Sequence, residues 1–296
     1  MDNKSKLIPY LEASFAVVVW GASFIATKIA VGEISPVTVV WLRFTMGVVI
    51  LGMAVALRRQ FALPDKSEWG YFALLGFLGI TFHQWLQSNG LLTAQANTTA
   101  WIVATTPVFM ALLGWLVLKE GLSWIKSAGI LLAAMGVMLV VTNGNLFSIL
   151  NGRFGTTGDF LILISAVNWA VFSVLSRRGL KTHPATRMMF FVMTLGWIFT
   201  SILFFSGKGI TEITQLKTNG WLAVAFLGIF CSGLAYIAWY DALQALSTAQ
   251  TGVSLYIEPL VAVVVAAIIL GEPITWASLA GGAVILFGVW LVNRQG

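Results

Sequence analysis

Two ionisable side chains, His83 and Glu258, lie in the middle of long apolar stretches and are the first candidates for chemistry. An imidazole changes its charge near physiological pH, and a carboxylate in apolar surroundings can hold or release a proton. Gln84 and Gln87 follow His83 and carry amides that could line a polar cavity with it. The alternative is a buried histidine that is hydrogen-bonded for structural reasons alone. Polar recognition and proton coupling are therefore the roles to test.

Enzyme chemistry finds no support in the spacing of reactive residues. The sequence has no paired-carboxylate, HExxH, CxxC or GxSxG constellation. Its single cysteine, Cys231, excludes an internal disulfide and a cysteine metal site. We therefore expect no catalytic residue, no cofactor and no metal.

The composition is that of an integral membrane protein. The 296 residues are 58% hydrophobic and 9% charged, whereas soluble domains average about 25% charged residues. A soluble enzyme or a nucleic-acid binder is thereby excluded, and the lipid bilayer is the expected surrounding. A membrane-spanning helix needs about 20 apolar residues. Ten such stretches predict an all-α membrane protein with ten transmembrane helices, at about 8–31, 36–57, 69–93, 98–118, 123–142, 158–178, 184–206, 221–243, 249–270 and 274–292.

The basic residues predict the orientation. With a cytoplasmic N-terminus, twelve of the 17 Lys and Arg residues fall on inner segments and three on outer ones. Such a bias follows the positive-inside rule. We expect both termini in the cytoplasm, and we read the net charge of +6 as a sign of topology and not of an acidic partner.

The ionisable residues inside the spans differ in depth. Each costs roughly 2.5–3.5 kcal/mol at a helix centre. Lys28, Arg43 and Asp241 lie toward span ends, where long side chains can extend to the interface, so we expect them to do so. His83 and Glu258 are too deep for that.

The sequence repeats itself. A shift of 152 residues aligns 69–140 with 221–292 without a gap, and 16 of the 72 pairs are identical. The chain therefore divides into 1–150 and 151–296, each with five predicted spans. Five is odd, so the second repeat crosses the membrane in the opposite sense, as in many secondary transporters whose sites lie near the midplane. Glycines on the fifth and tenth spans predict either close packing of these two spans or a dimer face, which leaves a monomer or a homodimer possible.

Two motifs recur in both repeats. Pro107 and Pro259 fall inside the fourth and ninth spans, where a proline removes one backbone hydrogen bond, so they predict packing kinks or gating hinges. Glu120 and Glu272 follow those spans, and we expect each to cap the helix that comes next in the chain.

Aromatic and polar residues near mid-span complete the predicted site. They could stack on a flat side chain and bond its polar groups. The predicted substrate-binding residues are His83, Trp101, Trp169, Phe82, Ser254, Tyr256 and Trp20.

These motifs together resemble the EamA family of the drug/metabolite transporter superfamily. The resemblance covers almost the whole chain and is carried by Trp20-Gly21-x-x-Phe24 and by the segments 118–124 (LKEGLSW) and 270–276 (LGEPITW). Within it, the segment 82–87 (FHQWLQ) is most similar to YddG-type exporters of aromatic amino acids. The resemblance implies a transporter of the plasma (inner) membrane that exports aromatic or apolar amino acids by alternating access. A carrier of another small metabolite or drug, or a non-transport membrane protein, are the alternatives.

Overall fold

The computed structural model of the protein describes residues 7–119, 121–147, 155–246 and 253–294. Every regular element in these ranges is a helix, which confirms the predicted all-α class. The elements are α1 (Leu7–Val31), α2 (Pro36–Leu57), α3 (Trp69–Gly76), η2 (Phe77–Phe82), α4 (His83–Gly90), α5 (Ala96–Val103), α6 (Thr106–Leu118), α7 (Trp124–Val141), α9 (Thr157–Leu180), α10 (Ala185–Ser206), α11 (Gly209–Ile213), α12 (Thr218–Ala225), η3 (Phe226–Leu234), α13 (Ala235–Ala245), α15 (Ile257–Leu270) and α16 (Trp276–Asn293).

Eight helical segments in the described ranges are long and apolar enough to cross a membrane. The other two predicted spans are also helical but differ from these eight. The run α3–η2–α4 contains the polar segment from His83 to Gly90, and α15 is shorter, with 14 residues. The short helix α11 lies in a connection for which no helix was predicted.

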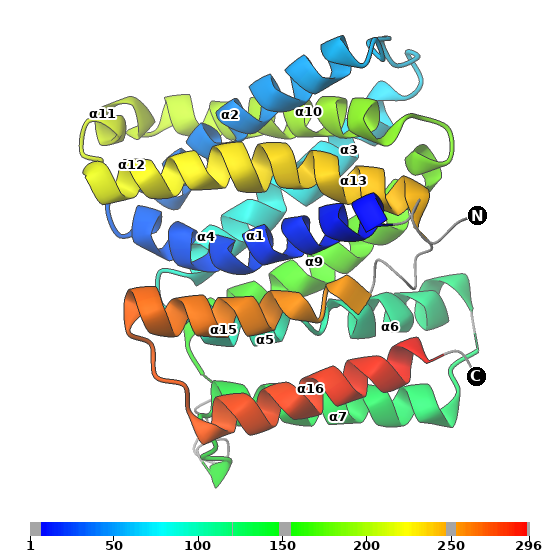
Figure 1. Ribbon diagram of the computed structural model, residues 1–296, viewed down its shortest axis with the longest axis vertical. Coiled ribbons are helices and arrows are strands. Elements are labelled where there is room, and N and C mark those ends of the chain that lie inside the picture. The colour runs from blue at the N-terminus through cyan, green and yellow to red at the C-terminus, as the bar shows by residue number, and fades with distance from the viewer. Residues whose placement is uncertain (1–6, 120, 148–154, 247–252, 295–296) are drawn as a thin grey trace.

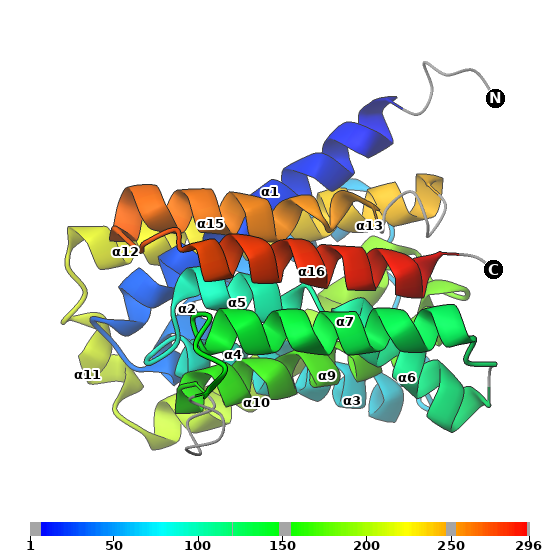
Figure 2. The same ribbon diagram turned by 90° about the horizontal axis from the view of Figure 1, so that it is seen from below.

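The long helices run along a common direction, and α1 begins at the same end of the bundle at which α16 ends (Figures 1 and 2). We name this the inner end, because the charge pattern predicts it to be cytoplasmic. The opposite end, where α1 ends and α16 begins, is the outer end. Helix starts are defined locally, since Ser35, Ser123, Thr156 and Thr275 each accept a hydrogen bond from an N–H in the first turn of the following helix.

Helices α7 and α16 lie side by side at one edge of the bundle (Figures 1 and 2). A Cβ on Gly129 would lie 2.6 Å from the Gly288 carbonyl oxygen, and one on Gly136 would lie 2.7 Å from the Gly281 oxygen. The backbones therefore touch, in antiparallel order, through glycines. Of the two predicted uses of these glycines, the structure shows packing within one chain.

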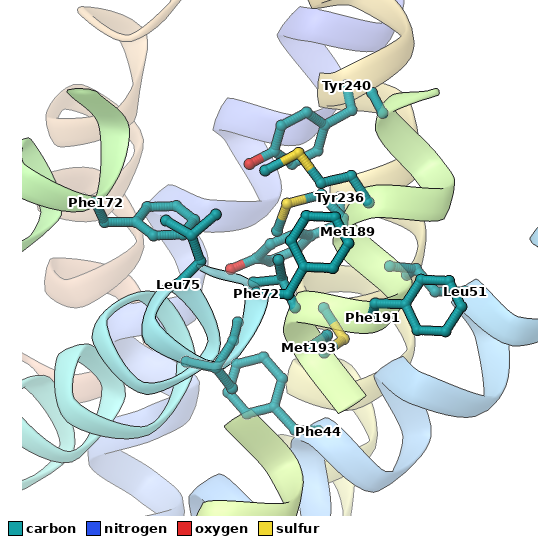
Figure 3. Close-up of a cluster of buried hydrophobic side chains, with 14 of the residues drawn as sticks. Phe44, Leu51, Phe72, Leu75, Phe172, Met189, Phe191, Met193, Tyr236 and Tyr240 are labelled. Atoms are coloured by element: carbon teal, nitrogen blue, oxygen red, sulfur yellow. The ribbon is translucent and has the colours of Figure 1, made fainter. Parts of the chain in front are cut away.

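A buried hydrophobic cluster joins α2, α3, α9, α10 and α13 (Figure 3). It includes Phe44, Phe72, Phe172 and Tyr236 as buried members, and Trp169 packs against it. This cluster fixes the helices that carry most of the candidate site.

Candidate functional site

Two π-helical segments occur at equivalent positions of the sequence repeat. Shifted by 152 residues, η2 covers 229–234, which is the second part of η3. A π-turn leaves carbonyl groups outside the regular ladder and is frequent at functional sites. The Leu78 carbonyl, which accepts from the His83 backbone N–H, also accepts from Asn168 Nδ2 at 2.7 Å. Because η2 ends directly before His83, it sets the rotation of the polar α4 segment.

His83 is buried against α9. Its Nδ1 lies 3.2 Å from the Ser165 carbonyl oxygen, and its ring lies 4.7 Å from the ring of Trp169. A carbonyl only accepts, so Nδ1 carries a proton and donates. The Trp169 ring in turn lies 4.8 Å from Phe172. The structure therefore brings together two predicted site residues, His83 and Trp169.

Arg43 does not extend to the interface, so that prediction was wrong. Its side chain is buried, and Nε donates to Ser232 Oγ at 3.0 Å while Nη1 donates to Gln84 Oε1 at 2.9 Å. These contacts join α2 to η3 and α4. The neutral oxygens of Ser232 and Gln84 hold the guanidinium inside the bundle because they offer it acceptors there.

Trp20 belongs to the same part of the molecule. Its Nε1 donates to the Cys231 carbonyl at 3.1 Å, and its ring contacts Tyr236 at 5.7 Å and Trp239 at 5.4 Å. Trp20 and Trp169 pack against the same buried cluster. Aromatic side chains from α1, α9 and α13 thus pack together at one buried cluster.

Trp101 and Tyr256 pack against a different cluster. The Trp101 indole donates to Ser278 Oγ at 3.0 Å and covers Gly282, so it joins α5 to α16. The Tyr256 hydroxyl accepts from Asn293 Nδ2 at 3.2 Å, near the end of α16. Among the described residues, no ring contact or hydrogen bond joins Trp101 or Tyr256 to His83 or Trp169.

Phe82 and Ser254 also have separate surroundings. Phe82 stacks at 5.8 Å on the exposed ring of Phe77. Ser254 is buried just before the break that precedes α15. The seven predicted residues therefore form one central group, His83, Trp169 and Trp20, and four that lie elsewhere in this conformation.

Both motif prolines begin a helix. Pro107 is in the first turn of α6 after a break at 104–105, and Pro259 is in the first turn of α15 after a break at 255–256. The carbonyl four residues before each proline has a partner: Val103 accepts from Thr106 Oγ1 at 2.7 Å, and Leu255 accepts from the Glu258 N–H at 3.2 Å. The spans are thus interrupted, and a proline fits there because first-turn N–H groups need no partner within the helix.

Glu258 follows the second of these breaks and is partly exposed. Its backbone carbonyl approaches Gly21 of α1 so closely that a Cβ there would lie 2.6 Å from it. Within the part of the chain that the structure describes, no group of three or more His, Cys, Asp or Glu residues could hold a metal ion.

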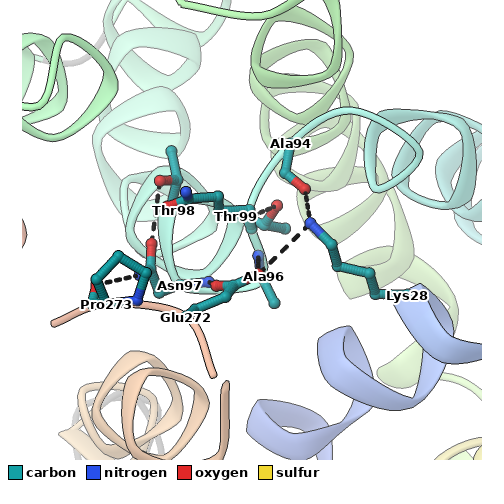
Figure 4. Close-up of polar contacts among 9 residues, drawn as sticks. Lys28, Ala94, Ala96, Asn97, Thr98, Thr99, Glu272 and Pro273 are labelled. Atoms are coloured by element: carbon teal, nitrogen blue, oxygen red, sulfur yellow. Dashed lines mark hydrogen bonds and ion pairs between the residues drawn. The ribbon is translucent and has the colours of Figure 1, made fainter. Parts of the chain in front are cut away.

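The outer end is tied by a carboxylate that caps a distant helix. Glu272 accepts from the Ala96 and Asn97 backbone N–H groups at 2.8 and 3.0 Å and pairs with Lys28 Nζ at 3.4 Å (Figure 4). Lys28 also donates to the Ala94 carbonyl. Glu272 therefore caps a helix as predicted, but the helix is α5 and not α16, the next one in the chain. Thr275 caps α16. Glu120 lies outside the described residues.

At the inner end, Asp241 accepts two hydrogen bonds from Arg58, at 2.7 and 2.6 Å. This pair joins α13 to the end of α2. The Asp241 side chain is 23% exposed and is paired with a cation.

Acid is expected to destabilise the outer end through Glu212. Its Oε2 accepts from Ser35 Oγ and Thr38 Oγ1, both at 2.5 Å. Burial alone would raise the pKa of Glu212, but these hydrogen bonds outweigh it and hold the pKa below its usual value of 4.5. A depressed carboxyl pKa stabilises the fold above the unfolded value, and this stability is lost as pH falls through the folded value. The melting temperature should fall between pH 5 and pH 3 less steeply in Glu212→Gln than in the wild type, and equal slopes would contradict this assignment.

Sequence reasoning missed the polar partners of the central group. Ser165 contributes a backbone carbonyl, which no side-chain pattern reveals. Ser232 lies in an apolar run, where a lone serine carries little signal. Arg43 did carry a signal, a charge seven residues inside a span, and only its burial was not foreseen.

Comparisons with known proteins identify the class and then the family. Three relatives are named as transporters or exporters, in keeping with the multi-pass bundle. An "Uncharacterized transporter" of Archaeoglobus fulgidus is 28% identical over 100% of this chain and 99% of its own length. The "Uncharacterized transporter YvbV" of Bacillus subtilis is 27% identical over 100% and 94%. A "Probable terminal-alkyne amino-acid exporter" of Streptantibioticus cattleyicolor is 27% identical over 94% and 91%.

The EamA-like transporter family matches residues 7–142 and 156–294, so the chain belongs to this family of the drug/metabolite transporter superfamily. One chain of known structure shares the fold, with a TM-score of 0.65 at 20% identity over 96% of this chain and 98% of that chain. The family match and the names of these relatives identify the protein as a membrane transporter.

Proposed function

We propose that this transporter exports amino acids with aromatic or apolar side chains by alternating access at the central group. The observation that carries the proposal is the buried contact of His83 with Trp169, beside Trp20 and Tyr236. Aromatic faces can stack on a flat side chain, and the imidazole can meet a polar group of the same ligand. The exporter named in Streptantibioticus cattleyicolor supports amino acids as the substrate class.

The proposed architecture is ten spans in two inverted five-helix repeats, 1–150 and 151–296, in the plasma membrane with both termini cytoplasmic. The two family matches support the repeat. The α7–α16 contact supports the inversion, because Gly129 meets the repeat mate of Gly136, and Gly136 meets the repeat mate of Gly129. Such reciprocal contacts are what a two-fold axis between equivalent elements produces. Breaks before Pro107 and Pro259 are placed to serve as hinges.

Replacing Trp169 by Ala should lower uptake of labelled L-phenylalanine into proteoliposomes about 10-fold, because an aromatic contact to the substrate is lost. Trp169→Phe should keep most of the activity. Trp124→Ala is the matched control, since Trp124 is 79% exposed at the start of α7. Full activity of Trp169→Ala would show that Trp169 does not contact the substrate. If the wild type transports members of a drug panel but no amino acid, the alternative substrate class is favoured.

Proton coupling is part of the same proposal, with His83 or Glu258 as the carrier. Flux in the presence of an imposed pH gradient should exceed flux without it, and His83→Gln or Glu258→Gln should abolish the difference. A gradient-independent wild type would instead indicate facilitated transport.

A further inference from the structure

Arg43 places a permanent positive charge inside the bundle. A guanidinium stays protonated in proteins, and this one is 4% exposed. Arg43 lies seven residues into α2, about 10 Å from the outer end of that helix. The ion pairs among the described residues join Lys28 to Glu272, Arg58 to Asp241 and His183 to Glu68, so none of them neutralises Arg43.

Only part of the guanidinium is engaged. Arginine has five N–H donors, and the structure uses one on Nε, toward Ser232, and one on Nη1, toward Gln84. No group in the described ranges accepts from Nη2. A buried charge without a counter-charge is costly, and an anion bound with good hydrogen-bond geometry offsets part of that cost.

The neighbours of Arg43 offer donors to a ligand. Ser232 Oγ accepts from Arg43, so its own proton is free to be donated. Gln84 accepts through Oε1, so its Nε2 keeps two donors. Such a set of donors suits an anion and not a cation.

Tyr236 extends the same site. Tyr236 and Tyr240 are 4% and 5% exposed, and no described residue forms a hydrogen bond with either hydroxyl, although tyrosine hydroxyls in a protein interior usually have a partner. Figure 3 shows the two hydroxyls pointing to the same side of α13. Tyr236 follows Ser232, the acceptor of the Arg43 Nε hydrogen bond, by about one helical turn. A ligand between these groups would meet one cation and several neutral donors.

We propose that Arg43 binds the carboxylate of the transported molecule, with Gln84 and Ser232 as its supporting donors. The substrate class is thereby narrowed to carboxylates, which a planar guanidinium binds with two parallel hydrogen bonds. One cation matches a monoanion, and the aromatic side chain then lies toward Trp169. This proposal rests on the proposed function, since it names the group by which an amino acid is held.

The test compares L-phenylalanine with phenethylamine, which has the same ring but no carboxylate, in proteoliposomes. The wild type should transport phenylalanine and discriminate against the amine. Arg43→Gln should lower kcat/KM for phenylalanine about 10- to 100-fold and abolish the discrimination, because a charge-assisted hydrogen bond is lost. Arg43→Lys, which keeps the charge but not the planar fork, should recover part of it. Arg178→Gln, a loss of the same charge at an exposed position of α9, should behave as the wild type.

Gln84→Glu tests the site without removing Arg43. The new carboxylate would form an ion pair with Arg43 and compete with the carboxylate of the substrate. The melting temperature should therefore rise, while KM for phenylalanine increases about 10-fold. Unchanged discrimination in Arg43→Gln, or an unchanged KM in Gln84→Glu, overturns the proposal. If Arg43→Gln does not fold, the Gln84→Glu result decides.

Failure of the proposed function is distinguishable from failure of this site. A wild type that transports no amino acid contradicts the proposed function. The probe 3-phenylpropionate, a carboxylate without an amine, then tests Arg43 directly by thermal stabilisation. Stabilisation in the wild type that Arg43→Gln lacks supports the carboxylate site, and equal shifts in the two proteins, or none in the wild type, overturn it.

Discussion

Replacing Glu272 by Gln is expected to open the outer end of the transporter. The Glu272 side chain is 8% exposed, and its two oxygens accept from the Ala96 and Asn97 N–H groups (Figure 4). These N–H groups are among the first of α5, which have no partner within the helix. A glutamine offers one oxygen and one NH₂ group, so one backbone donor would face another donor. Lys28 would also lose its counter-charge.

The expected size follows from hydrogen bonds to a charged group, about 1.5–3 kcal/mol each. A loss of this size shifts an open–closed equilibrium at least about 10-fold. Thr98 is buried near the start of α5. The rate at which a membrane-impermeant maleimide labels a Thr98→Cys variant therefore measures the open–closed equilibrium. The native Cys231 is fully buried and adds no background.

Glu33→Gln is the matched control. Glu33 also accepts from a backbone N–H at the outer end, that of Lys217 directly before α12, at 2.7 Å, but it does not bridge α5 and the loop before α16. It should leave labelling of the Thr98→Cys protein unchanged. Equal labelling in the Glu272→Gln and wild-type backgrounds would show that this carboxylate does not hold the outer end closed.

The second large effect is expected at the glycine contact of α7 and α16. A Cβ on Gly136 would lie 2.7 Å from both the Gly281 carbonyl oxygen and Ile285 Cγ1. Backbone atoms cannot move aside as a flexible side chain can, so Gly136→Ala must separate the two helices. Overpacking of this kind costs about 1–3 kcal/mol. The melting temperature in detergent should fall by several degrees, and by more in Gly136→Leu.

Gly70→Ala serves as the control, because a Cβ there meets nothing within 4 Å. It should raise stability slightly or leave it unchanged, since alanine favours a helix more than glycine does. A Gly136→Ala protein that melts with the wild type would mean that the close backbone contact contributes nothing to the fold.

Helix positions were predictable because each span is defined locally. An apolar stretch long enough to cross the bilayer must satisfy its backbone groups as a helix, and Ser35, Ser123, Thr156 and Thr275 mark where four helices begin. The family was equally visible, since its motifs are contiguous. Pro107 and Pro259 indicated irregularities near 104–105 and 255–256. The sequence did not show that these are interruptions of the helix, with each proline in the first turn of a new one.

The sequence by itself determined the helical membrane class, the position of the spans and the family, because these depend on local composition and short motifs. Only the tertiary structure decided which side chains meet. It separated Trp101 from Trp169, turned Arg43 inward to Gln84 and Ser232, and brought Glu272 to the start of α5. The physical reason is that these contacts join residues from 41 to 189 positions apart, so they depend on how helices rotate and pack against one another.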